Sequence, residues 1–349
     1  MTYLKKNKKL LVKGREALTV DDVLLVPTYG TVNSRAEVSV FSPLIAAPMD
    51  SVFNVERFIE YSNAELDTID PTLPRTATDL YALKAAWKPS WCGWIAVSTD
   101  PDEIESVISF FKSLADHIWI QMGIMVDTAH GLSPKAVRAY EQIKRALPWI
   151  NLMSGSVATG EAAVACARYC SHIRVGIGSG SMCTTRIQTG VGVPNLTAVA
   201  DCYYQLSKEN EHVKIVADGG ISTPGDVVKY LAAGADQVMV GRLFAECLDS
   251  AAPTVAMGSK IYKTYRGQAS KEYQEEHIGQ VRNGLPEGVT RTIPAYPKSM
   301  KERSEEICAG IKSACSYLGL NNSCDLNPAN VRFIRCSSST LKESKPLEV

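Results

Sequence analysis

Short apolar runs recur along the chain and are separated, for the most part, by stretches with helical periodicity. Strands that alternate with helices indicate a parallel sheet, and eight such units predict a closed (β/α)8 TIM barrel of the α/β class. An open, doubly wound sheet is the alternative. The second run is the weakest, because Pro71 and Pro74 follow it at once. The eight runs are 44–49, 66–69, 94–98, 124–127, 150–155, 173–178, 214–220 and 237–241.

Three of the intervening stretches carry clear helix signals. Residues 100–115 open with an acidic first turn and repeat apolar residues at helical spacing. Residues 133–147 begin with Ser133 as N-cap, followed by a proline at the first helical position. Residues 222–234 end on a glycine, as helices often do.

Two segments are too long to be simple connections, and we interpret both as functional loops: 179–193 after the sixth strand and 251–300 after the eighth. We predict a single domain over 1–349, with no inserted regulatory domain. Its basic N-terminal tail covers 1–17, its flap region 251–300 and its C-terminal tail 319–349.

Composition narrows the class of protein. Apolar residues make up 45% and charged residues 21%, which are ordinary globular values. Lys+Arg and Asp+Glu are both 37, so an overall basic footprint for nucleic acid is excluded. No apolar run approaches the roughly 18 residues of a membrane span, and the N-terminus does not resemble a signal peptide. Ten cysteines without a CxxC pair indicate reduced thiols in the cytoplasm, and five scattered histidines make a zinc site unexpected.

Small and reactive residues collect where the predicted strands end, which is where barrel enzymes place their active sites. The richest of these segments is GIGSGSMCTTR at 176–186. Its glycines allow positive φ, and successive amides there form an anion nest to which Ser181 adds a hydroxyl. Cys183, near these donors and Arg186, is a candidate nucleophile. A tight turn with a buried cysteine is the alternative for such a residue taken alone.

Two further strand ends, ADGGIS at 217–222 and VGR at 240–242, follow the seventh and eighth strands. The loops at these positions often hold a phosphate in barrel enzymes. The amides of Gly219, Gly220, Gly241 and Arg242 are the candidate donors. Asp218 is free to take a ribose diol. Simple left-handed turns into each helix are the alternative, but together with the loop after the sixth strand these segments predict a nucleoside monophosphate pocket.

Two more segments carry candidate chemistry. In DTAHG at 127–131, Asp127 is placed to accept hydrogen bonds from a ribose or an amide. His130 is either a catalytic base or a capping residue. The polar stretch 265–288 resembles a mobile flap, on which Glu287 is held between Pro286 and Gly288. Glu287 then contacts a base edge, or is simply solvated surface.

These motifs resemble the inosine monophosphate dehydrogenase and GMP reductase family over most of the chain. The loop after the sixth strand and the ADGG segment are the most specific. The similar segments are 18–35, APMDSV at 47–52, VDTAHGLS at 126–133, SVATGEAA at 156–163, 175–195, 215–245 and YRG at 265–267.

The resemblance implies a TIM barrel that usually assembles as a homotetramer, with a purine nucleoside monophosphate as substrate. It implies that Cys183 attacks purine C2 to form a thioimidate and that Thr185 is the catalytic threonine. Glu287 lies where the family holds the purine, and we assign it to catalysis with Cys183 and Thr185. The implied substrate-binding residues are Met49, Ser181, Asp218, Gly219, Gly220, Gly241, Arg242, Tyr265 and Gly267. Those implied for the cofactor are Asp127, Thr128, Ala129 and Arg75, and carbonyls of Gly178, Gly180 and Cys183 match a potassium-binding turn.

Three features favour a reductase, which converts GMP to IMP and ammonia with NADPH, over a dehydrogenase, which oxidises IMP with NAD⁺ and hydrolyses the intermediate. No room is left for the regulatory domain of most dehydrogenases. No Arg-Tyr pair, which the dehydrogenases use to activate water, occurs between Tyr265 and Glu287. The segment YRGQASKEYQ resembles a stretch of some bacterial reductases. IMP dehydrogenase and a non-catalytic purine nucleotide-binding protein remain the alternatives.

The chain also departs from the family pattern at two points. Gly155-Ser156 replaces the usual Gly-Asn, and TLPRTAT replaces a strand end that carries a His and a basic residue. Arg75 stands in for that basic group. Because of these departures, two choices stay open: whether the cofactor is NADPH or NADH, and whether the substrate carries ribose or deoxyribose.

Overall fold

The computed structural model describes residues 16–30, 32–64, 68–75, 79–114, 121–281, 285–337 and 339–344. A parallel eight-stranded sheet is hydrogen-bonded in the order β2-β9-β8-β7-β6-β5-β4-β3. The ring closes where the Ala46 amide donates to the Asp70 carbonyl at 2.9 Å. The predicted TIM barrel is therefore confirmed. Its strands are β2 (Leu44–Ala46), β3 (Thr72–Leu73), β4 (Cys92–Val97), β5 (Gln121–Val126), β6 (Asn151–Met153), β7 (His172–Val175), β8 (Lys214–Asp218) and β9 (Gln237–Val240).

Seven predicted strands overlap the observed ones, and the second does not. We placed it at 66–69, of which 66–67 lie outside the described residues, whereas β3 is Thr72–Leu73, between the two prolines. Proline lacks an amide hydrogen, but the Pro71 carbonyl still accepts the Trp94 amide at 2.9 Å. A strand of two residues tolerates a proline at each end. The prediction was wrong because it took the two prolines to mark the end of the strand.

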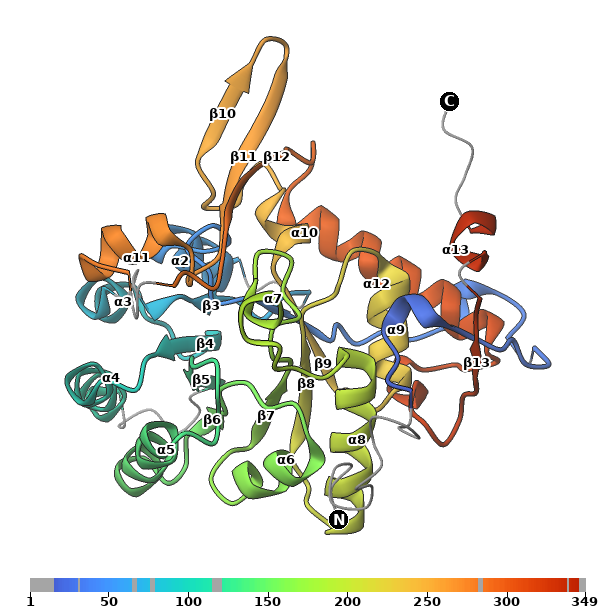
Figure 1. Ribbon diagram of the computed structural model, residues 1–349, viewed down its shortest axis with the longest axis horizontal. Coiled ribbons are helices and arrows are strands. Elements are labelled where there is room, and N and C mark those ends of the chain that lie inside the picture. The colour runs from blue at the N-terminus through green and yellow to red at the C-terminus, as the bar shows by residue number, and fades with distance from the viewer. Residues whose placement is uncertain are drawn as a thin grey trace.

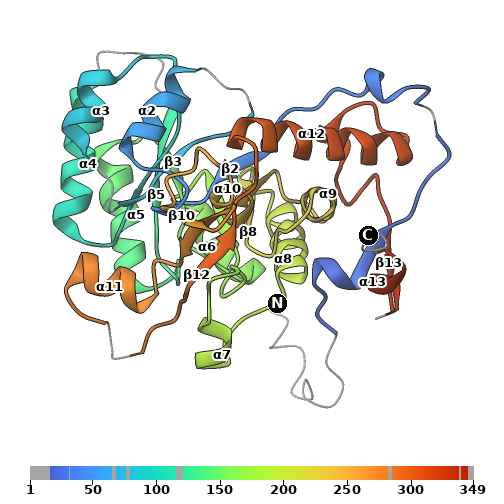
Figure 2. The same ribbon diagram turned by 90° about the horizontal axis from the view of Figure 1, so that it is seen from above.

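Helices wrap the outside of the barrel, as the view from above shows (Figure 2). The three predicted helices are confirmed as α4, α5 and α9. Ser133 caps α5 by accepting the Ala136 amide, and Thr223 forms a capping box with Asp226 at the start of α9. The outer helices are α2 (Val55–Asn63), α3 (Leu80–Ala86), α4 (Pro101–Ser113), α5 (Pro134–Ala146), α6 (Gly160–Ala167), α8 (Asn195–Lys208), α9 (Pro224–Ala232) and α12 (Met300–Tyr317).

The long segment after β9 builds a small antiparallel sheet of β10 (Thr254–Met257), β11 (Lys260–Arg266) and β12 (Thr290–Pro294). Its β10–β11 hairpin projects from the barrel in Figure 1. The same segment carries α10 (Arg242–Ala245) at its start and α11 (Lys271–Ile278) between β11 and β12. The flap region is therefore largely structured.

The two ends of the described chain meet. Strand β1 (Val23–Leu25) pairs antiparallel with β13 (Phe333–Arg335), and α13 (Thr340–Glu343) follows. Leu326 and Val331 are buried, so much of 319–344 packs on the body of the protein. The predicted basic tail lies almost entirely outside the described residues.

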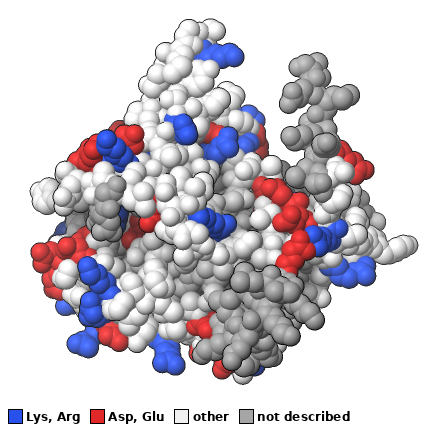
Figure 3. Space-filling model, viewed as in Figure 1, with Lys and Arg blue, Asp and Glu red and all other residues white. Residues whose placement is uncertain are grey.

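The surface shows no strong separation of charge on the face drawn in Figure 3, where basic and acidic side chains are interspersed. Among the helices of the described ranges, none is both long enough and apolar enough to cross a bilayer. All ten cysteines are free thiols.

The barrel has two cores, one on each face of the sheet. Along β7, Ile173 and Val175 join the large core between sheet and helices. His172 is buried on the inner face, where its ring meets the Trp94 ring edge-on at 4.7 Å. Arg174, two residues further, points the same way at the strand's other end. The inner core consists of Ile45, Ala47, Trp94, Met125, Met153, Val216 and Met239.

Burial of His172 makes the fold sensitive to acid. Desolvation lowers the pKa of its imidazole from the ordinary 6.5 to about 3, so the folded state holds it neutral where the unfolded chain already takes up a proton. The unfolded state therefore binds more protons between these values, and stability falls as pH drops through that window. We expect His172 to cost about 2 kcal/mol of unfolding free energy between pH 6.5 and pH 5.

Urea unfolding of His172→Gln at several pH values tests this. Between pH 6.5 and pH 5, the unfolding free energy of His172→Gln should fall by about 2 kcal/mol less than that of the wild type. His212→Gln, at an exposed histidine, is the matched control and should keep the wild-type slope. Equal slopes in the wild type and His172→Gln would show that His172 is not the titrating group.

Candidate active site

One cavity of about 1170 Å³ opens at the carboxyl ends of the barrel strands. Single-ligand pockets usually measure roughly 300–1,000 Å³, so this one is somewhat larger than is typical for one ligand. The loops after β2, β4, β5, β7 and β8 contribute to its lining, together with two stretches of the flap. Most of the predicted site residues line it: Met49, Arg75, Asp127, Thr128, Ala129, Gly178, Gly180, Cys183, Thr185, Asp218, Tyr265, Gly267 and Glu287.

The loop after β7 folds tightly enough to present Cys183. Gly176 and Gly178 have φ of 150° and 67°, as expected, whereas Gly180 does not have a positive φ. The Gly180 carbonyl instead accepts the Cys183 amide at 2.9 Å, which closes the turn. A short helix, α7 (Thr185–Thr189), follows at once. The carbonyls predicted to hold potassium therefore belong to one compact turn.

Arg186 stabilises this loop through hydrogen bonds to its backbone. Its guanidinium donates to the Ile177 carbonyl at 2.9 Å and to the Val193 carbonyl at 2.6 Å. The sequence placed this charge near the Cys183 thiol, but its hydrogen bonds are to backbone on both sides of the loop. Arg186 therefore orders the loop.

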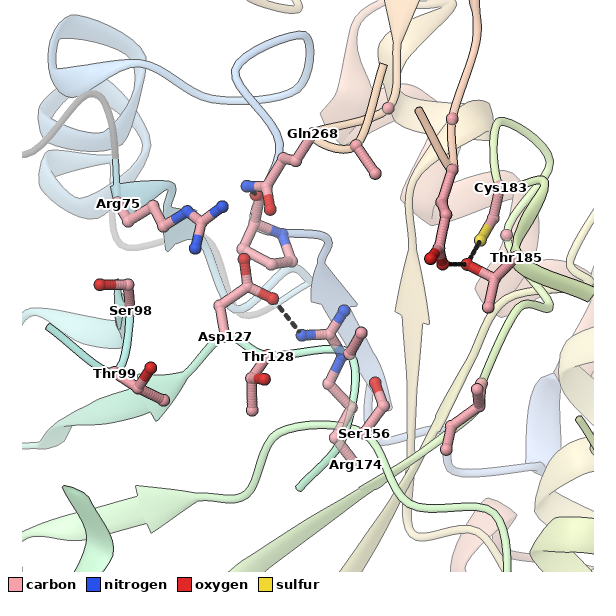
Figure 4. Close-up of a pocket in the computed structure, with 18 of the residues that line it drawn as sticks. Arg75, Ser98, Thr99, Asp127, Thr128, Ser156, Arg174, Cys183, Thr185 and Gln268 are labelled. Atoms are coloured by element: carbon pink, nitrogen blue, oxygen red, sulfur yellow. Dashed lines mark hydrogen bonds and ion pairs between the residues drawn. The ribbon is translucent and has the colours of Figure 1, made fainter. Parts of the chain in front are cut away.

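Cys183, Thr185 and Glu287 form one hydrogen-bonded chain. The Cys183 Sγ donates to Thr185 Oγ1 at 3.2 Å, and Thr185 Oγ1 donates to Glu287 Oε2 at 2.6 Å (Figure 4). A hydroxyl donates and accepts at once, so Thr185 connects the thiol to the carboxylate. This arrangement can carry a proton between the nucleophile and Glu287, although the two residues are 104 positions apart in sequence.

Backbone pairing holds the flap against the cysteine loop. The Thr184 amide donates to the Glu287 carbonyl at 2.8 Å, and the Val289 amide donates to the Met182 carbonyl at 3.0 Å. A Cβ on Gly267 would lie 3.2 Å from Met182 Cβ, so the flap backbone approaches closely here as well. Glu287 is thus fixed by main-chain contacts on either side of Cys183.

Arg174, which belongs to none of the candidate motifs, lies between the two carboxylates at the floor of the cavity. Its Nη1 is 2.7 Å from Asp127 Oδ1 and its Nε is 2.9 Å from Asp218 Oδ2. Burial alone would lower its pKa, but the charges of Asp218 and Asp127 raise the pKa of the guanidinium. Asp218 is therefore not wholly free, because one carboxylate oxygen is already engaged.

Asp127 has a second guanidinium nearby. Arg75 reaches the cavity from the segment after β3, on the side of Asp127 away from Arg174 (Figure 4). Burial would lower the pKa of Arg75, but the charge of Asp127 and a hydrogen bond with Tyr273 raise it. Ser98 and Thr99 lie on the same side, away from Cys183. This side of the cavity matches the residues assigned to the cofactor.

Tyr265 marks the predicted phosphate region. Its hydroxyl lies 3.5 Å from Ser181 Oγ and 3.6 Å from Met49 Sδ, and a Cβ on Gly241 would lie 3.0 Å from it. Burial raises the pKa of this phenol to about 12, so it is a neutral donor at physiological pH. Residues from three strand ends and the flap therefore converge on one hydroxyl.

Some predicted residues lie outside the cavity lining. Gly219, Gly220, Gly241, Arg242 and Ser181 do not line it, although Ser181 and Gly241 adjoin Tyr265. Gly219, with φ of 89°, turns the chain tightly against the cysteine loop. The Arg242 Nε pairs with Glu246 Oε1 at 2.7 Å, one helical turn further along the chain.

His130 is exposed and is not part of the cavity lining, so its capping alternative is favoured over a catalytic base. Its carbonyl accepts the Ser133 amide at the start of α5. Gln268 lines the cavity and donates to the Pro48 carbonyl, a contact that its position in a polar flap did not reveal. In contrast, Arg174 could have been found, because a basic residue inside an apolar strand is unusual.

Comparisons with known proteins agree with this geometry. Residues 88–347 match the family model described as "IMP dehydrogenase / GMP reductase domain". The chain is 33% identical to a GMP reductase of Phytophthora infestans over 92% of this chain and 91% of that protein. For a GMP reductase of Caenorhabditis elegans the identity is 32%, over 97% of each.

Similarity to dehydrogenases is higher in identity but shorter in extent. An inosine-5'-monophosphate dehydrogenase of Borreliella burgdorferi is 38% identical over 73% of this chain and 63% of its own length. One of Chlorobaculum tepidum is matched over 47% of its length. The chain thus spans about half to two thirds of these relatives.

The paired carboxylates generate a stability prediction. Arg174→Met should lower the free energy of unfolding by about 3 kcal/mol, because it removes the guanidinium that pairs with both Asp127 and Asp218, two largely buried carboxylates. Urea unfolding at pH 7 measures this. Arg145→Met removes an exposed arginine of α5 and should change stability little. A loss no larger in Arg174→Met than in this control would mean that the ion pairs contribute nothing net.

Proposed function

Since the chain belongs to the IMP dehydrogenase / GMP reductase family, we propose that it converts GMP to IMP with release of ammonia, using NADPH. The observation that carries the proposal is the hydrogen-bonded chain from Cys183 through Thr185 to Glu287. It joins a nucleophile to a carboxylate on the flap, and a proton donor and acceptor are what departure of an amino group requires.

In the proposed reaction the Cys183 sulfur bonds to purine C2 after its proton passes through Thr185 towards Glu287. The C2 amino group takes up a proton from the same chain and leaves as ammonia, which gives a thioimidate. Bound NADPH would supply the hydride that C2 receives, after which cleavage of the C2–S bond would release IMP and restore the Cys183 thiolate. Tyr265, Ser181 and neighbouring amides hold the phosphate, and Asp218 holds the ribose, so that the base stays within reach of sulfur.

Two observations support a reductase over a dehydrogenase. The chain spans more than nine tenths of the two reductases, but less than two thirds of the two dehydrogenases. The flap segment that carries Glu287 pairs directly with the cysteine loop, and its sequence lacks an Arg-Tyr pair to activate water. IMP oxidation by NAD⁺ is the second candidate, favoured by the 38% identity to a dehydrogenase.

Three further assignments belong to the proposal. The carbonyls of Gly178, Gly180 and Cys183 would hold a potassium ion, which suits hard oxygen ligands in a tight turn. A homotetramer is expected from the family. The ten free thiols support a reducing, cytoplasmic compartment.

Nicotinamide absorbance tests the proposal directly. Purified protein is mixed with GMP and NADPH in one cuvette and with IMP and NAD⁺ in another, both with potassium. We expect absorbance to fall in the first, with ammonia released in equal amount, and not in Cys183→Ala. A rise in the second cuvette alone would establish a dehydrogenase, and no change in either would favour deoxynucleotides or a binding protein.

Glu287 provides a sharper test of mechanism. Glu287→Gln keeps the shape but removes the proton acceptor, so kcat for GMP should fall about 100-fold while the Kd for GMP stays within about threefold. Turnover and calorimetric binding measure the two. Glu275→Gln, on the same flap at an exposed position, should behave as wild type. Normal turnover in Glu287→Gln would remove it from the proton path.

Two cations support the choice of NADPH. Lys135 and Arg138 both line the cavity from α5 and are one turn apart, hence on one face of that helix. They are exposed and form no ion pair with another residue in the described ranges. Unpaired cations at the rim of a dinucleotide cavity suit the extra 2′-phosphate of NADPH.

This assignment predicts a change of cofactor preference. Replacing Lys135 and Arg138 together by alanine should raise the KM for NADPH at least about tenfold and leave the KM for NADH nearly unchanged, because only NADPH loses a charged partner. Steady-state kinetics with both cofactors measures this. Arg145→Ala, on the same helix, is the control. An equal effect on both cofactors would contradict recognition of the 2′-phosphate.

A further inference from the structure

Lys263 is a charged residue without access to solvent. It lies on β11, the long strand of the projecting hairpin (Figure 1), and is only 2% exposed. Its Nζ donates to three backbone carbonyls, those of Leu248 at 2.9 Å, Ser250 at 3.3 Å and Ala252 at 3.1 Å. An ammonium has three N–H donors, so its hydrogen-bonding capacity is used completely.

The surroundings of this ammonium resemble a cation site made of carbonyl dipoles. Among the described carboxylates, none lies within ion-pair distance of Lys263. The charge of Asp249 acts on it from further away, and that carboxylate accepts hydrogen bonds from the Tyr61 hydroxyl and the Met300 amide. Burial lowers the pKa of Lys263, as it does for any ammonium removed from water. Backbone oxygens therefore supply most of its stabilisation.

The position of Lys263 links this cage to the candidate active site. Lys263 and Tyr265 are two residues apart on β11 and both are buried, so they lie on the same face of the strand. The carbonyls come from the segment between α10 and β10, which also pairs with β11 where the Thr264 amide donates to the Pro253 carbonyl at 2.8 Å. Contacts that hold Lys263 in place therefore also hold strand β11. That strand positions the Tyr265 hydroxyl beside Met49 and Ser181.

We propose that Lys263 is a positioning residue whose ammonium serves as a built-in cation. Held by the carbonyls of Leu248, Ser250 and Ala252, it fixes β11 on the barrel and sets the Tyr265 hydroxyl in the nucleotide site. A neutral side chain leaves three buried carbonyls facing one another without a donor, which favours a displaced strand. The effect on nucleotide binding rests on the proposed function, whereas the cation cage does not.

Chemical rescue tests the cage itself. Lys263→Ala removes the atoms of propylammonium, so that cation can refill the space it leaves. We expect the midpoint of thermal unfolding to fall by at least about 5 °C and to recover in part with added propylammonium. Propanol has the same shape without charge, and tetramethylammonium has charge without N–H donors. Neither should rescue, and equal recovery with propanol would show that the space, not the cation, matters.

Ligand binding tests the positioning role. Lys263→Met keeps the length of the side chain, and the Kd for GMP should rise at least about tenfold, with a smaller effect on kcat. Propylammonium should restore the affinity of Lys263→Ala. Lys260→Met, at an exposed lysine of the same strand, should match the wild type. Unchanged GMP affinity in Lys263→Met would overturn the positioning role.

These outcomes separate the inference from the proposed function. If the wild type neither binds nor reduces GMP, the proposed function fails, while melting and rescue of Lys263→Ala still decide whether the cage exists. If the wild type is an active reductase and Lys263→Met melts and binds GMP as the wild type does, the inference alone fails.

Discussion

A buried guanidinium organises the floor of the active-site face. Arg174 holds Asp127 at 2.7 Å and Asp218 at 2.9 Å, and these carboxylates stand at the ends of different strands, β5 and β8. Burying an unpaired charge carries a large cost, so the ion pairs with Arg174 stabilise both carboxylates in this place. Arg174 therefore allows one cavity to present an acidic group on the side assigned to the cofactor and another on the side assigned to the ribose.

The second requirement is that the flap reaches the cysteine loop. Main-chain hydrogen bonds on either side of Cys183 bring Glu287 to Thr185, and the base of the flap is fixed by the ammonium of Lys263. The two connections act at opposite ends of the flap. Strands β11 and β12 also pair with each other, with Tyr265 opposite Arg291, so the small sheet holds together the segments that carry Tyr265 and Glu287.

The barrel was predictable because its signals are local and repeated. Seven of eight strands and three helices follow from apolar runs and from helix-start and helix-end residues. Strand β3 does not, since two residues between prolines carry too little pattern. Cys183, Thr185 and Glu287 were chosen from motifs and the structure brings them together. The partners of Arg174, Lys263 and Arg186 were not predictable, because each bond joins positions that only the closed barrel places side by side. Long-range pairing of a single side chain leaves no periodic trace in sequence.

The contacts of each basic side chain indicate whether it stabilises the protein itself or is available to bind a ligand. Arg174 pairs with two carboxylates through its Nε and Nη1, and the buried Lys263 ammonium donates to three carbonyls within the chain. Lys135 and Arg138 line the same cavity as Arg174, yet they are exposed and form no ion pair among the described residues. All three donors of the Lys263 ammonium are used within the chain, so Lys263 acts by holding other groups in place, and Arg174 does the same for the carboxylates of Asp127 and Asp218. An unpaired cation at a cavity rim keeps its donors for an anionic ligand, and this distinction supports placing the cofactor phosphate at α5.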